Sequence, residues 1–190
     1  MSPRTAKPPL DVLALFPQIG DIIDPKLKRG VIEIWEEMWQ DSSWTDIRAL
    51  QVSSEIPYPH IPHAQCVVEL AISVADSFEK HHGVSVNRDH LIAAAVLQDA
   101  SKLMEYELGP DGKMRHTSIG KNYPHGFWCA KLTVDKGLHD AIGHVMLTHS
   151  SSAAKFPDSL EGKILYYVDQ IDVIGCHKDR WKKLIHIAKT

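Results

Sequence analysis

Apolar residues recur at helical spacing along almost the whole chain. The segment that follows Asp24 and Pro25 carries the clearest stripe, made by apolar side chains three or four residues apart: Leu27, Val31, Ile34, Trp35, Met38 and Trp39. Asp24 suits an N-cap and Pro25 the first helical position, so we expect a helix that ends at the Asp41-Ser42-Ser43 stretch. Trp35 and Trp39 either pack into a core or form a dimer contact. A homo-oligomer therefore remains one of the two alternatives.

Further helices are predicted in the rest of the chain. Prolines at 57, 59 and 62 make residues 51–62 an extended connector. Capping residues and apolar stripes then predict helices over residues 63–80, 87–98, 124–137, 138–149 and 159–175. The stretch 109–112, Gly-Pro-Asp-Gly, predicts a turn between two short strands. With one such turn region among helices, we expect an all-α protein folded as a single-domain helical bundle.

Composition limits the class of protein and its partners. The 190 residues suffice for one domain, or one domain with an extension, and 44% hydrophobic with 24% charged residues is typical of a soluble globular chain. A net charge of −3 provides no field that would attract nucleic acid or an anionic membrane. The basic cluster near the C-terminus is expected to be the solvated face of a last helix: Lys178, Arg180, Lys182, Lys183 and Lys189. We therefore expect neither a nucleic-acid nor a membrane partner.

Cysteine usage indicates the compartment. Cys66, Cys129 and Cys176 are odd in number, far apart and outside any C-x-x-C motif, so they predict neither a disulfide framework nor a zinc knuckle. The first nine residues and the short apolar stretch after them are typical of neither a signal peptide nor a spanning helix. Both observations favour a reducing, cytoplasmic location.

The most informative stretch is the end of the apolar run 91–97, which is followed directly by Gln98 and Asp99, and then by Lys102. Burying a charged group costs several kcal/mol unless the group is paired or bound to a metal. Asp99 therefore needs a partner if it is buried. The alternative is a helix end that emerges into solvent, with Lys102 near the last carbonyl groups.

Histidines are the obvious candidates for such a partner, since the chain has twelve of them. His63 and His149 fall on the apolar stripes of their predicted helices, and His125 falls in the first turn of its helix. Asp169 lies in a largely apolar helix. A single inward histidine is usually a hydrogen-bonded core residue. Several inward histidines together with Asp99 and Asp169 instead make the ligand set that a divalent metal requires.

The order of these residues resembles the HD-domain superfamily, which is named for a His…His-Asp…Asp ligand pattern. His63, the Gln98-Asp99 pair and Asp169 follow that order, and residues 97–103 look like the family's L-H-D-I-G-K-L. The positions of His125 and His149 are similar to those of a subgroup that includes two-metal hydrolases of nucleotides and other phosphate esters. The resemblance covers about residues 60–174. It implies an HD-like helical domain over residues 60–190, preceded by a helical N-terminal extension over residues 1–59.

The resemblance also implies roles for single residues. His63, Asp99 and Asp169 would hold one metal, and Asp99 would bridge to a second metal held by His125 and His149. Lys102 would contact an anionic oxygen of the substrate. The implied protein is a metal-dependent hydrolase of a small anionic substrate, a phosphate ester or a nucleotide, that uses one or two Fe, Mn or Zn ions to activate a water.

Gln98 departs from the family pattern, which has histidine there. An amide oxygen is a weak ligand for a transition metal, so the first metal site is expected to be weakened. Two metals could still bind, with Gln98 or water filling the gap. Otherwise the chain is a mono-metal hydrolase, hydratase or oxygenase acting on a non-phosphate organic acid, or a degenerate, non-catalytic HD domain.

Other polar residues are expected to be less important. His60 lies one turn before His63 but between two prolines, and it is a weaker candidate for a residue of the pocket. His116 is the alternative to His125 as a metal ligand. Asp172, one turn after Asp169, is the alternative to Asp169.

Overall fold

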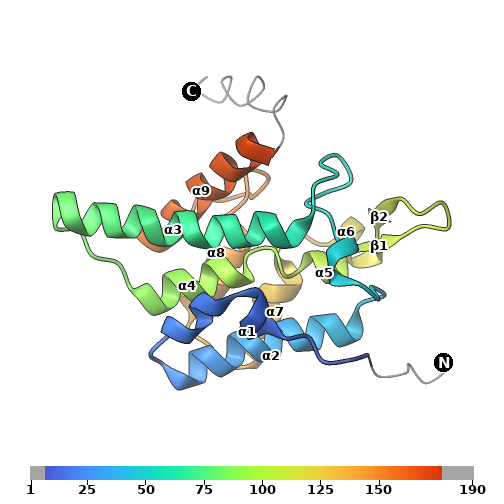
Figure 1. The fold of residues 1–190 in the computed structure, drawn as a ribbon, viewed down its shortest axis with the longest axis horizontal. Helices are drawn as coiled ribbons and strands as arrows, with labels where there is room; N and C mark the ends of the chain where they lie inside the picture. Colours follow the sequence, from blue (N-terminus) through green and yellow to red (C-terminus); the bar gives the residue numbers. More distant parts are fainter. Residues whose placement is uncertain (1–6, 177–190) are drawn as a thin grey trace.

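The structure is a computed structural model, and it describes residues 7–176. The basic cluster of residues 178–189 lies outside this range. The described chain is mostly helical with one small hairpin, which confirms the all-α prediction (Figure 1). The elements are α1 (Val12–Leu15), the 3-10 turn η1 (Pro17–Asp21), α2 (Pro25–Asp41), η2 (Ile47–Ala49), α3 (His60–His82), α4 (Arg88–Leu97), α5 (Lys102–Glu105), β1 (Tyr106–Leu108), β2 (Met114–His116), α6 (Ser118–Asn122), α7 (Phe127–Asp135), α8 (Asp140–Thr148) and α9 (Leu160–Cys176).

Helix α4 forms the centre of the bundle. It packs against α2, α3, α8 and α9, and Figure 1 shows it between α3 and α2. Every residue from Leu91 to Leu97 is buried. This enclosure explains why the run is apolar on all sides, with no polar face of the kind that a surface helix shows.

Helix α2 begins and ends as its sequence predicts. The Asp24 carboxylate accepts hydrogen bonds from the backbone N–H groups of Lys26 and Leu27, and all six residues of the apolar stripe are buried. Trp35 and Trp39 pack inward, and the Trp35 indole donates to the Val96 carbonyl oxygen at 3.1 Å. The buried apolar residues between Val12 and Leu50 thus belong to the same core as the later helices, while a domain boundary at residue 59 stays a prediction.

Helices α3 and α9 differ from expectation in the residues that they bury. Helix α3 begins at His60 rather than at residue 63, and its buried face holds several alanines, while three residues of the predicted stripe are only half-buried: Leu70, Val74 and Phe78. Small side chains are favoured there because α3 packs against both α4 and α9. In α9, Ile171 is 52% exposed, and Asp172 instead lies toward α3, where its carboxylate contacts His63.

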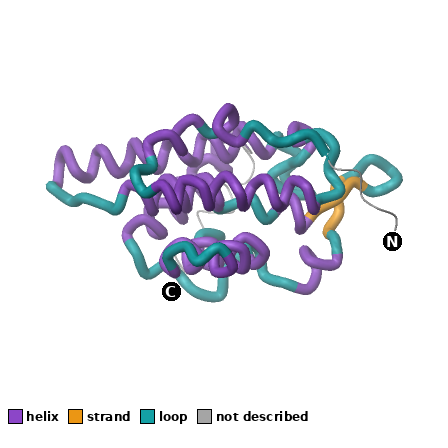
Figure 2. The backbone as a smooth tube through the Cα atoms, turned by 90° about the horizontal axis from the view of Figure 1, so that it is seen from below, coloured by secondary structure: helices purple, strands orange, loops and turns teal. Residues whose placement is uncertain are grey.

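The hairpin of β1 and β2 lies with α6 at one end of the molecule (Figure 1). Strands β1 and β2, orange in Figure 2, pair antiparallel across the predicted turn. In this pairing Tyr106 is opposite His116. Helix α7 begins at Phe127 and not at Pro124, because Gly126 before it has a left-handed backbone with φ 79°. His125 therefore lies in the turn before α7, and its predicted place in a first helical turn is wrong.

Among residues 7–176, we find no helix that combines the length and the apolar character needed to cross a bilayer.

Candidate metal centre

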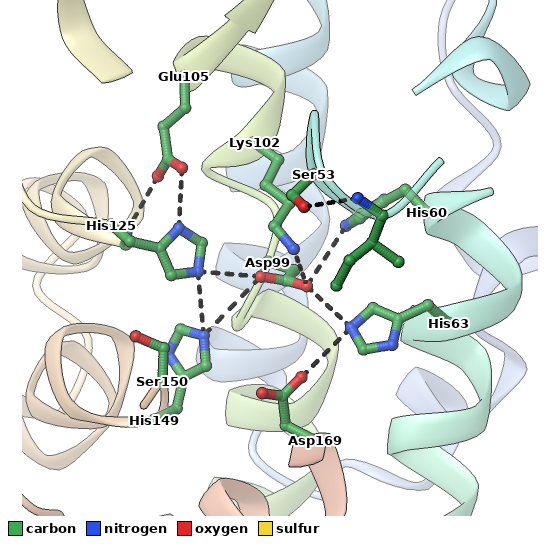
Figure 3. Close-up of polar contacts among 12 residues, drawn as sticks. Ser53, His60, His63, Asp99, Lys102, Glu105, His125, His149, Ser150 and Asp169 are labelled. Carbon is green, nitrogen blue, oxygen red and sulfur yellow. Dashed lines mark hydrogen bonds and ion pairs between the residues drawn. The ribbon is translucent and has the colours of Figure 1, made fainter. Parts of the chain in front are cut away.

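The site is built around Asp99, in the turn that joins α4 to α5. Its carboxylate is buried, and its two oxygens face different partners (Figure 3). Oδ2 lies 2.7 Å from Lys102 Nζ and 3.0 Å from His63 Nε2. Oδ1 lies 3.0 Å from His125 Nε2 and 3.8 Å from His149 Nε2. The alternative in which this helix end emerges into solvent is therefore wrong.

One candidate group of metal ligands consists of His63, Asp99 and Asp169, which come from α3, the α4–α5 turn and α9. All three residues are buried, and their ligand atoms lie within 4.8 Å of one another. His63 Nε2 is 3.3 Å from Asp169 Oδ1. One imidazole and two carboxylates are suitable ligands for a divalent transition metal. We call this set the first donor group.

The second donor group consists of Asp99, His125 and His149, whose ligand atoms also lie within 4.8 Å of one another. His125 precedes α7, and His149 is the C-cap residue of α8, which packs against α7. The two Nε2 atoms are 3.2 Å apart. Asp99 belongs to both groups, so the two groups share one carboxylate.

The outward-facing nitrogens of these histidines are also held. His63 Nδ1 lies 2.6 Å from Asp172, His125 Nδ1 lies 2.8 Å from Glu105, and His149 Nδ1 lies 3.1 Å from the Met146 carbonyl oxygen. An acceptor at Nδ1 keeps a proton there and directs the Nε2 lone pair toward a metal.

Two of these outer residues were not expected in these positions. Asp169 and Asp172 both contact His63, so Asp172 does not replace Asp169. Glu105 was not singled out, although it follows Lys102 by three residues just as Lys102 follows Asp99. His116 is in neither donor group; it packs on Tyr106 with ring centroids 4.4 Å apart.

The charges at the site are strongly coupled. Burial alone would raise the pKa of Asp99, but Lys102 and three histidines lower it well below the usual value. Burial would likewise lower the pKa of His63 and His125, but neighbouring carboxylates outweigh it and raise these values to about 11 and about 10. In the metal-free protein, protons on the histidines thus compensate the buried carboxylates, which is the role that bound cations would take over.

Two buried polar side chains beside Asp99 lack hydrogen-bond partners among the described residues. They are His60, at both ring nitrogens, and Gln98, at both amide atoms. Burial lowers the pKa of His60 to about 3, so its imidazole is neutral. Buried polar groups are normally satisfied, and orphans of this kind indicate a missing ligand or ion. The residues present therefore fit a metal centre.

The centre opens into a cavity of about 320 Å³. Carboxylates, hydroxyl groups and imidazoles dominate its lining: Ser53, Ser54, Glu55, Asp99, Lys102, Glu105, Tyr106, His116, His125, His149, Ser150, Ser151, Ser152 and Asp169. Among the residues that the structure describes, Lys102 is the one lysine or arginine in this lining. A second cavity of about 630 Å³ adjoins it and shares His125, Ser150 and Ser152.

The fold and the site define an all-helical protein with buried histidines and aspartates that can hold a metal ion, and the chain is similar to a curated phosphodiesterase. That relative is the dihydroneopterin 2',3'-cyclic phosphate phosphodiesterase of Methanocaldococcus jannaschii, with 31% identity over 112 residues, or 59% of this chain. The chain spans 45% of the relative's length. No protein-family model matches the chain, and no solved structure matches it.

Proposed function

We propose that this protein is a metal-dependent hydrolase of small phosphate esters, with cyclic phosphodiesters as the first substrates to test. The observation that carries the proposal is the position of Asp99, whose two oxygens face two separate donor groups inside a cavity. The named activity of the similar phosphodiesterase supports the same class of reaction.

Each residue of the centre has a role in this proposal. His63 and Asp169 would hold one divalent ion, His125 and His149 would hold another, and Asp99 would contribute to both sets of ligands. Such ions lower the pKa of a coordinated water and neutralise charge on the phosphoryl oxygens. Glu105 and Asp172 keep the protons of His125 and His63 on Nδ1. The Nε2 atoms then stay free to bind.

Lys102 has a second role at the same centre. Its ammonium group is 2.7 Å from Asp99 Oδ2 and lines the cavity, so it can donate a hydrogen bond to a phosphoryl oxygen beside the bridging carboxylate. A buried cation placed where negative charge develops stabilises the transition state of phosphoryl transfer.

The cavities favour a compact substrate with hydroxyl groups. Hydroxyl side chains from two separate segments line the first cavity, contributed by residues 53–54 and by residues 150–152. They can donate to or accept from a sugar-like group next to the phosphate. The adjoining cavity, whose lining includes Leu147, Ala153 and Ala154, provides room for a less polar portion of the substrate.

The direct test is hydrolysis of a panel of nucleoside 2',3'-cyclic phosphates and phosphate monoesters by chelator-treated protein, with Mn, Fe or Zn added back. We expect activity only with metal, and a loss of at least about 100-fold in Asp99→Asn, because one carboxylate serves both donor groups. Asp111→Asn, in the exposed hairpin turn, is the matched control.

Other outcomes would redirect or reject the proposal. One metal ion per chain without hydrolysis of any phosphate ester would favour the mono-metal alternative with a non-phosphate organic acid. No bound metal and no activity with any added metal would reject hydrolysis and favour a non-catalytic HD-like domain.

A further inference from the structure

We propose that His60 completes the first donor group and supplies the imidazole that the HD-type motif would have at Gln98. The inference rests on the proposed function in one respect, namely that the first donor group holds a divalent ion. It adds a ligand that the motif pattern does not include, and it predicts two occupied metal sites despite Gln98.

The position of His60 is the first argument. It lies one turn before His63 on the same face of α3, and it is fully buried. Its Nε2 atom is 4.0 Å from Asp99 Oδ2, the oxygen that His63 Nε2 also faces at 3.0 Å. Figure 3 shows the side chains of both histidines directed toward this one carboxylate.

The distances agree with shared coordination. Two nitrogen or oxygen ligands at about 2.1 Å from a metal are about 3.0 Å apart at right angles and up to about 4.2 Å apart on opposite sides. The separations at this group are 3.0 Å, 3.3 Å and, for His60, 4.0 Å. His60 is not among the atoms that all lie within 4.8 Å of one another, so coordination requires its ring to move inward.

The surroundings of His60 leave it no other polar partner among the described residues. Neither ring nitrogen has a hydrogen bond, and the indole of Trp35 packs on the ring with a centroid distance of 6.1 Å. Phe16 packs on Trp35 in turn. A buried imidazole with an apolar neighbour on one side and a carboxylate on the other is suited to an ion held between itself and that carboxylate.

Gln98 is the competing donor, because its amide is also buried and unpaired. Imidazole nitrogen is the better ligand for Zn, Fe and Mn than a neutral amide oxygen, which suits harder cations. His60 is therefore the expected ligand for a transition metal, and the two candidates can be separated by substitution.

The test is zinc binding by the full chain, measured as zinc per chain after chelator treatment and as affinity by chelator competition. We expect two zinc ions in the unsubstituted protein and a loss of at least about tenfold in affinity for one of them in His60→Leu. His81→Leu, at the exposed end of the same helix, is the matched control and should bind zinc unchanged. Circular dichroism would verify that each variant is folded.

A second measurement does not depend on the fold of His60→Leu. In the variant that carries both His125→Ala and His149→Ala, only the first donor group remains. X-ray absorption of its bound zinc should show two imidazole ligands, from His60 and His63, where one would be expected without His60.

The outcomes separate this inference from the proposed function. Two zinc ions bound with unchanged affinity in His60→Leu, or one imidazole in the absorption spectrum, would overturn the role of His60 alone. Loss of zinc in Gln98→Leu with retention in His60→Leu would assign the ligand to the amide instead. An unsubstituted protein that binds no zinc, manganese or iron would overturn both.

Discussion

At the scale of single residues, metal binding at the site depends on which nitrogen of each histidine carries a proton. Each histidine of the two donor groups has one nitrogen near Asp99 and the other near a fixed acceptor. Glu105 is the acceptor with two functions, since one oxygen pairs with His125 Nδ1 and the other accepts the backbone N–H of Gly126 at 3.0 Å. It fixes both the ring and the turn from which the ring extends.

Glu105→Ala should therefore weaken metal binding at the second donor group by about 10- to 100-fold, as removal of such outer carboxylates usually does. Glu105→Gln, which can still accept at one atom, should lie between this variant and the unsubstituted protein. The measurement is metal affinity by competition, with Glu107→Ala on β1 as the control. Equal affinities in Glu105→Ala and the control would show that the carboxylate is only structural.

Sequence patterns predicted that five residues could converge, and the structure brings them together: His63, Asp99, His125, His149 and Asp169. Helical periodicity does not reveal the role of Glu105, because its partners are His125 and the backbone of Gly126 in the turn before α7. The sequence indicates only a minor role for His60, because the prolines around it predict an extended chain. In the structure Pro62 is accommodated in the first turn of α3.

At the scale of elements, Gly126 controls how closely α7 and α8 approach. Its backbone is left-handed at φ 79°, and a Cβ atom there would overlap the carbonyl oxygen of Met146 in α8. That same oxygen is an acceptor for His149 Nδ1. The absence of a side chain thus allows the turn before α7 and the end of α8 to place His125 and His149 beside each other.

Gly126→Ala should lower the free energy of unfolding by about 2 kcal/mol or more, since a left-handed alanine is strained and a backbone overlap adds to the strain. Gly83→Ala is the matched control: Gly83 is also left-handed, at φ 65°, but a Cβ there meets no atom within 4 Å. The control should lose only about 1 kcal/mol. Urea denaturation of both variants would decide, and equal losses would show that the contact with Met146 is unimportant.

At the scale of the whole molecule, hydrophobic periodicity was sufficient for the all-α class and for most helices. Periodicity did not predict which residues are buried when a helix packs against two neighbouring helices at once. Helix α9 shows the reason, because Ile171 is exposed while Asp172 turns toward α3. A buried charge network can determine which side of a helix faces inward, and apolar spacing carries no information about it.

The same network makes stability depend on pH. In metal-free protein the pKa of His63 is raised to about 11 and that of His125 to about 10, by carboxylates that outweigh burial. A raised pKa gives stability that is complete below the unfolded value, about 6.5, and is lost as pH rises toward the folded value. The free energy of unfolding should therefore fall between pH 6.5 and pH 8, by about 1–3 kcal/mol.

Urea denaturation of chelator-treated protein at these two pH values is the measurement, and His125→Gln should show a smaller fall. Saturating zinc should reverse the trend, since metal binding requires deprotonated ligands and strengthens as pH rises. A stability that is constant from pH 6.5 to pH 8 in the metal-free protein would contradict the protonation of both histidines.

The enclosure of α4 determines the order in which parts of the protein open. Amide hydrogens of Leu91 to Leu97 should exchange with solvent only through global unfolding, because the helix is covered on every side, whereas those of β1, β2 and α6 should exchange through local opening. Hydrogen exchange followed by mass spectrometry would measure this difference, and similar rates in the two regions would contradict it. Asp99 is two residues beyond the end of this slowly exchanging segment, whereas His125 extends from a turn next to α6. We therefore expect the His125 side of the centre to open locally while Asp99 keeps its place.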